Sequence, residues 1–128
     1  MNTNGKNFGS KRLVVGAHYG VMDFIIQRLS AAILAIYTII FSIYIVVSLP
    51  LTYEKWKNLF TFHWYFLPMG QILSFVAFCA LAWHAWIGVR DIWMDYIKFL
   101  GVRLFLYTLT IFWLLSSTIY FSKILWSI

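Results

Sequence analysis

Between Leu29 and Tyr53 the chain reads LSAAILAIYTIIFSIYIVVSLPLTY, a run of 25 residues without a single Asp, Glu, Lys or Arg. An α-helix rises about 1.5 Å per residue, so roughly 20 apolar residues cross the ~30 Å hydrocarbon core of a bilayer. A charged side chain at the centre of such a helix costs about 2.5–3.5 kcal/mol, which is consistent with the absence of charge here. We therefore expect a transmembrane helix over about 29–49.

Two further charge-free runs follow, Asn58 to Val89 with 32 residues and Leu104 to Ser122 with 19. Each is long enough for one spanning helix, which we expect at about 67–89 and 104–122. The second helix is expected to continue through an amphipathic stretch that ends near Tyr96. The sequence thus predicts an all-α membrane protein with three transmembrane helices, in which residues 1–128 form a single membrane-anchor domain.

The composition of the chain agrees with a lipid environment. Of its 128 residues, 62% are hydrophobic and 11% are charged, whereas soluble domains carry about 25% charged residues. The net charge of +6 does not indicate nucleic-acid binding, because the basic residues lie in short polar segments between apolar runs rather than in one patch. The start, Met1 to Arg12, is polar, and no apolar core follows it at signal-peptide distance, so we expect 1–28 to be retained as a cytoplasmic segment.

Lysine and arginine counts predict the orientation. Seven basic residues belong to the N-terminal segment or to the connection between the second and third helices, namely Lys6, Lys11, Arg12, Arg28, Arg90, Lys98 and Arg103. Three belong to the opposite side, namely Lys55, Lys57 and Lys123. The positive-inside rule therefore predicts a cytoplasmic N-terminus and a periplasmic C-terminus.

His84 is the most unusual residue of the second span, because an ionisable group inside a membrane costs a few kcal/mol and usually faces the bundle interior. Its helical face carries Ala77, Ala80, Gly88, Asp91 and Asp95. The small residues leave room for a close helix or a flat ring system. His84 is either a packing histidine hydrogen-bonded to a neighbouring helix or an axial ligand of haem iron. Because His18 and His63 lie outside the spans, a bis-histidine haem would need its second ligand from another polypeptide.

Two other features stand at the predicted cytoplasmic ends of the helices. Arg28 is either an ordinary orienting charge or a guanidinium placed to pair with an anionic group such as a haem propionate. Asp23 is either its partner or a solvated acid. Asp95 and Tyr96 are either a helix-end acid with an interfacial tyrosine or a pair that donates a hydrogen bond and a proton to a quinone carbonyl.

These residues form a recognisable set. His84-Ala85-Trp86-Ile87-Gly88 is followed by Asp95-Tyr96-Ile97-Lys98 and preceded, before the first span, by Asp23-Phe24 and Gln27-Arg28-Leu29-Ser30-Ala31. In these motifs, and in its size and three predicted spans, the chain resembles the D-type hydrophobic membrane anchor subunit of bacterial succinate dehydrogenase (complex II).

The resemblance implies a role for each residue of the set. His84 would be one axial ligand of a b-type haem, with the other supplied by the cytochrome b-type partner subunit, so that the chain is half of a haem-binding helix bundle. Arg28 would lie near a haem propionate. Tyr96 would hydrogen-bond a ubiquinone carbonyl, supported by Asp95.

The same resemblance implies the assembly and its location. Flavoprotein, iron–sulfur and cytochrome b-type subunits would be the partners in a multi-pass complex of the bacterial inner membrane that passes electrons from succinate to ubiquinone, linking the tricarboxylic acid cycle to the respiratory chain. The chain alone is not expected to oxidise succinate. Three alternatives stay open: an anchor of a fumarate reductase, a purely structural anchor without quinone chemistry, and a small membrane transporter or accessory protein that uses His84 and Asp91 as a proton relay. A haem-ligand histidine favours succinate oxidation.

Overall fold

The structure is a computed structural model that describes the backbone of residues 16–128 and the side chains of residues 20–128. It contains four helices: α1 (Gly16–Val47), α2 (Tyr53–Thr61), α3 (Met69–Tyr96) and α4 (Leu100–Ser127). Three of them, α1, α3 and α4, are long and apolar enough to cross a membrane. The predicted all-α architecture with three spanning helices is confirmed. The first basic residues of the orientation count, Lys6 to Arg12, lie outside the described residues.

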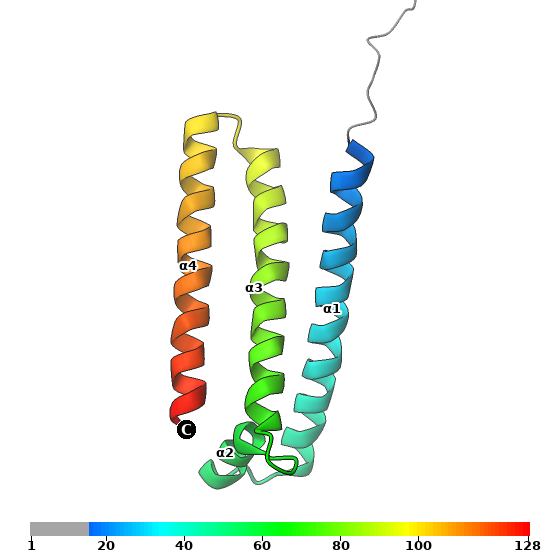
Figure 1. The fold of residues 1–128 in the computed structure, drawn as a ribbon, viewed down its shortest axis with the longest axis vertical. Coiled ribbons are helices and arrows are strands. Elements are labelled where there is room, and N and C mark those ends of the chain that lie inside the picture. The colour runs from blue at the N-terminus through cyan, green and yellow to red at the C-terminus, as the bar shows by residue number, and fades with distance from the viewer. Residues whose placement is uncertain (1–15) are drawn as a thin grey trace, which may run out of the picture.

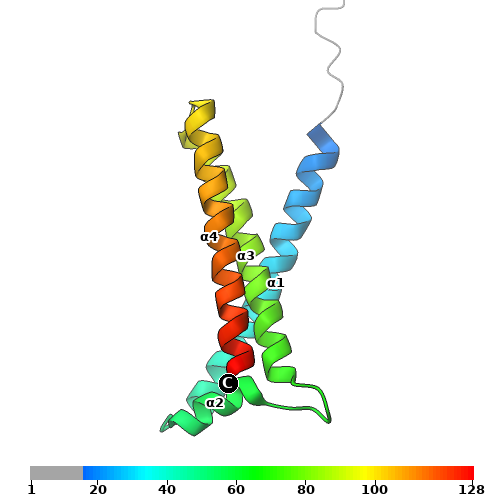
Figure 2. The same ribbon diagram turned by 60° about the vertical axis from the view of Figure 1, so that its left-hand side comes forward.

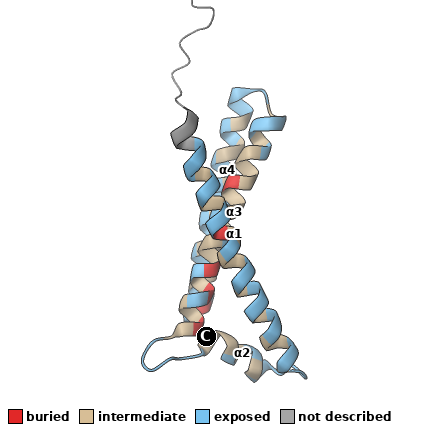
Figure 3. Cartoon of the chain, turned by 90° about the vertical axis from the view of Figure 1, so that its right-hand side faces the viewer, coloured by how far each residue is buried: buried red, intermediate tan, exposed pale blue. Residues whose placement is uncertain are grey.

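The three long helices form a row with α3 in the middle (Figure 1). The start of α1 and the α3–α4 connection lie at one end of the long helices, and α2 and the C-terminus lie at the opposite end. Figures 2 and 3 show that α1 crosses α3 at an angle, whereas α4 runs close beside α3. The two ends of the long helices correspond to the two sides of the membrane between which the basic residues are divided.

The helices extend beyond the charge-free runs from which they were expected. The first helix begins at Gly16 rather than near 29, and the last ends at Ser127 rather than near 122. The second spanning helix ends at Tyr96, as expected from its amphipathic end. Charge-free runs locate the apolar core of a membrane, whereas a helix continues into the interface, where charged side chains are solvated.

The short helix α2 is amphipathic and was not expected from the sequence. Thr52 caps its N-terminus, accepting a hydrogen bond from the backbone N–H of Lys55 at 3.4 Å, and Glu54 complements the helix dipole in the first turn. The Lys55 ammonium donates to the carbonyls of Ser48 at 2.8 Å and Pro50 at 3.2 Å, just past the end of α1. This lysine thereby fixes α2 against the end of the first span.

Few side chains are buried within the chain itself (Figure 3). The buried residues among those described are Ser30, Gly70, Ser74, Ala77, Ile87 and Leu125. Aromatic contacts join α3 to α4, the closest being the stacked rings of Phe78 and Phe121, whose centroids are 4.2 Å apart. Most large apolar side chains face outward, as expected where lipid or other membrane subunits surround the helices.

Candidate functional site

Four polar side chains of α1, spaced seven residues apart, bond to other elements. We call Asp23, Ser30, Tyr37 and Tyr44 the α1 seam. The first three reach Arg90, His84 and Ser74 of α3 at 2.6, 3.1 and 2.9 Å, and the fourth donates to the Lys55 carbonyl of α2 at 3.2 Å. Because seven residues make nearly two helical turns, the seam follows one face of α1 and sets its register against α3.

His84 lies at the centre of this contact. It is half-buried, and its Nδ1 is 3.1 Å from the Oγ of Ser30, which is only 5% exposed. The Ser30 hydroxyl also contacts the backbone carbonyl of Gln27 in its own helix at 3.0 Å. The imidazole is therefore held through Nδ1, while Nε2 has no hydrogen-bond partner among residues 20–128.

The helix face beside His84 is open. A Cβ built at Gly88, one turn away, would meet no atom within 4 Å. The contrast is Gly70, at the other end of the same helix, where a Cβ would lie 2.5 Å from the Phe60 carbonyl oxygen. The glycine next to His84 is thus not required by packing within this chain and leaves space for a group from outside it.

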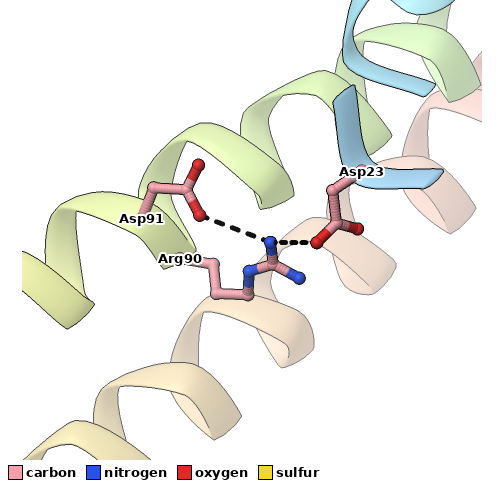
Figure 4. Close-up of polar contacts among 3 residues, drawn as sticks. All are labelled: Asp23, Arg90 and Asp91. Carbon is pink, nitrogen blue, oxygen red and sulfur yellow. Dashed lines mark hydrogen bonds and ion pairs between the residues drawn. The ribbon is translucent and has the colours of Figure 1, made fainter. Parts of the chain in front are cut away.

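An ion pair joins α1 and α3 two turns from His84 (Figure 4). The Arg90 guanidinium donates to Asp23 at 2.6 Å and to its neighbour Asp91 at 3.3 Å. Asp23 therefore pairs with Arg90 rather than with Arg28, while its side chain stays 41% exposed. Sequence reasoning counted Arg90 only as an orienting charge, and the structure gives it a contact between helices.

Arg28 is exposed on α1. Its guanidinium carbon lies 5.2 Å from the centroid of the Phe24 ring, a cation–π contact one turn away. In the described part of the chain no carboxylate lies within ion-pair distance of it. Arg28 also points about 200° around the helix from Ser30, so contacts within this chain do not join it to His84.

Asp95 and Tyr96 end α3, and both are exposed, Tyr96 by 83%. Twelve residues separate Tyr96 from His84, which is about 18 Å along a helix. The structure thus brings Asp95 and Tyr96 together at the C-terminal end of α3 and leaves His84 separate, deeper in the span. Neither side chain makes a hydrogen bond with another described residue.

The contacts of Ser30 with His84 and of Asp23 with Arg90 were not expected from the sequence. Ser30 had been read only as part of a motif around Arg28. The signal that could have revealed both is the seven-residue repeat of polar residues along an otherwise apolar helix. Once one contact of the α1 seam is known, the antiparallel register brings Asp23 next to Arg90.

The chain is similar to known transmembrane subunits. Residues 2–121 match the family described as succinate dehydrogenase/fumarate reductase transmembrane subunit. The chain is also 32% identical over 107 residues to the succinate dehydrogenase hydrophobic membrane anchor subunit of Coxiella burnetii (strain RSA 493 / Nine Mile phase I). That similarity covers 84% of this chain and 89% of the relative.

Proposed function

This chain belongs to the succinate dehydrogenase/fumarate reductase transmembrane subunit family, and from this premise we propose a specific role for it. It anchors a succinate:ubiquinone oxidoreductase in the membrane, contributes one axial ligand to a b-type haem and forms part of the site where ubiquinone is reduced. The observation that carries the proposal is His84, an imidazole within an apolar span that is held through Nδ1 and has no hydrogen-bond partner at Nε2 among residues 20–128.

The residues around His84 fit a haem. No three His, Cys, Asp or Glu side chains within residues 20–128 gather as a metal site, and among these residues His84 is the one histidine that lies within a candidate span. A single histidine within a span suits haem, because the porphyrin supplies four ligands of the iron and the protein supplies only the axial ones. His63 is exposed in the α2–α3 connection, with Nδ1 2.6 Å from the Thr61 carbonyl. We propose that the second axial ligand comes from the cytochrome b-type partner subunit.

Arg28 is proposed to pair with a haem propionate. Its guanidinium is held over Phe24 and has no carboxylate partner in the described part of the chain. A planar guanidinium binds a carboxylate through two parallel hydrogen bonds. Bound haem would supply one-electron redox chemistry, and the work of this chain would be to hold and orient it.

Tyr96 and Asp95 are proposed to act on ubiquinone. The Tyr96 phenol donates a hydrogen bond to a quinone carbonyl oxygen, which polarises the carbonyl and prepares it for protonation. Asp95, the preceding residue, supports that hydrogen bond at the same end of α3. Two electrons from succinate oxidation in the partner subunits and two protons convert the quinone to the quinol.

The proposed assembly contains a flavoprotein, an iron–sulfur protein and a cytochrome b-type membrane protein in the bacterial inner membrane. We place the start of α1 and the α3–α4 connection in the cytoplasm, where the soluble subunits would dock, and the C-terminus in the periplasm. Basic residues favour this orientation. The family name covers both directions of the reaction, and we favour succinate oxidation because the chain carries a haem-type histidine.

A Tyr96→Phe variant tests the quinone site. We expect the succinate:ubiquinone reductase rate to fall roughly 10²-fold, since a positioned general acid contributes about 10²–10⁴-fold. Reduction of a dye that takes electrons from the soluble subunits should stay at the wild-type rate. Tyr53→Phe, which alters an exposed tyrosine at the opposite end of the row, is the matched control. An unchanged rate of ubiquinone reduction in Tyr96→Phe would contradict the proposed quinone site and favour a purely structural anchor.

A further inference from the structure

The hydroxyl of Ser30 is shared between two partners. Its Oγ lies 3.0 Å from the Gln27 carbonyl oxygen and 3.1 Å from Nδ1 of His84. A carbonyl oxygen only accepts hydrogen bonds, so the single hydroxyl hydrogen is directed at Gln27. A lone pair of the hydroxyl oxygen then faces His84, and it accepts a hydrogen bond when Nδ1 carries the proton.

We propose that Ser30 is a positioning residue for His84: it fixes the imidazole in the tautomer protonated on Nδ1, so that Nε2 is the nitrogen available to iron. This inference rests on the proposed haem ligation and adds a residue outside the predicted site. Ser30 is suited to the task because it is 5% exposed and lies on the α1 seam. Water therefore does not compete for its hydroxyl.

The neighbouring seam contacts hold the serine in place. Asp23 and Tyr37, seven residues before and after Ser30, bond to Arg90 and Ser74 of α3. These two contacts fix the position of α1 along α3 on either side of the imidazole. The Ser30–His84 distance is thus set by the helix register, and the imidazole plane is set with it.

The hydrogen bond has a consequence at the other ring nitrogen. A ligating histidine whose second N–H donates to an acceptor is a more basic ligand and is held in one orientation. A more basic ligand favours ferric over ferrous iron and thereby lowers the midpoint potential. Loss of such an outer contact typically weakens the affinity for the metal roughly 10- to 100-fold.

The test uses the intact complex purified through a tag on this chain. A redox titration followed at the haem band gives the midpoint potential, and the haem-to-flavin ratio gives the occupancy. In Ser30→Ala we expect the potential to rise and the affinity for haem to fall roughly 10-fold or more, which lowers the haem-to-flavin ratio. Ser42→Ala is the control, because Ser42 is exposed on the same helix and makes no hydrogen bond to another described residue.

A matched pair separates the hydroxyl from the volume of the side chain. Ser30→Thr keeps the hydroxyl, and Ser30→Val has the same shape without it. We expect Thr to retain the wild-type potential and Val to share the raised potential of Ala. If Ala does not assemble, the difference between Thr and Val still decides the question.

The outcomes also separate this inference from the proposed function. Wild-type potential and haem content in both Ser30→Ala and Ser30→Val would overturn the positioning role and leave haem ligation by His84 intact. A wild-type complex without haem would overturn both proposals. A potential that rises in Ala and Val and stays at the wild-type value in Thr would support both.

Discussion

At the scale of single residues, one ion pair links two of the spanning helices, that of Arg90 on α3 with Asp23 on α1. Arg90 and Asp23 lie near the end of the spans, with side chains 25% and 41% exposed. Partial exposure weakens the attraction between the two charges, and the apolar surroundings make either charge costly when it is alone. The pair therefore joins α1 to α3 with modest energy.

A double-mutant cycle on this pair should reveal that energy. Arg90→Gln and Asp23→Asn should each lower the free energy of unfolding in detergent, and the double variant should lose less than the two single losses combined. We expect a coupling of about 1 kcal/mol. Lys98→Gln, at an exposed charge in the α3–α4 connection, should have no effect. Strictly additive losses would mean that the 2.6 Å contact contributes nothing to stability.

Single residues also mark where sequence reasoning succeeds and fails. His84 could be singled out because a histidine inside an apolar run violates membrane energetics, and such violations are visible in one dimension. The partners of His84 and Arg90 could not be singled out in this way, because they lie on another helix and are brought close only by the register between the two helices. Ser30 is an ordinary residue in an apolar helix until the fold brings it to an imidazole.

At the scale of elements, hydropathy accounts for the long helices and does not detect α2. The charge-free run from Asn58 to Val89 contains the last residues of α2, a connection and most of α3, so the absence of charge does not separate these three parts. A nine-residue amphipathic helix with two lysines and a glutamate in its sequence reads as a polar connection. What makes it a helix here is capping by Thr52 and packing against α3.

The packing of α2 on α3 depends on Gly70. The backbone N–H of Gly70 donates to the Phe62 carbonyl at 2.9 Å, and an added Cβ would lie 2.5 Å from the Phe60 carbonyl oxygen. We expect Gly70→Ala to separate the two helices and to lower the free energy of unfolding by about 1–3 kcal/mol.

Thermal unfolding of the purified complex measures this loss, and Gly101→Ala is its control. A Cβ at Gly101, in the first turn of α4, would meet nothing within 4 Å. This control should unfold at the wild-type temperature. If the two alanine variants unfolded at the same temperature, the close approach of α2 to α3 would not contribute to stability.

At the scale of the whole molecule, the row of three helices buries little of its own surface. Its buried hydrophobic residues among those described are Ala77, Ile87 and Leu125. In the part of the chain that the structure describes, the row is one helix deep and does not close into a bundle around His84. This arrangement is what a membrane anchor needs when the other half of a haem site comes from a partner subunit.

The most direct test of the central claim is the dithionite-reduced minus oxidised visible spectrum of the complex purified through a tag on this chain. We expect a b-type haem signal in the wild type and in His63→Ala, and its loss in His84→Ala, with the flavoprotein and iron–sulfur subunits still co-purifying. His63 is exposed in the α2–α3 connection and so controls for the loss of a histidine. A b-type signal that persists unchanged in His84→Ala would contradict the account.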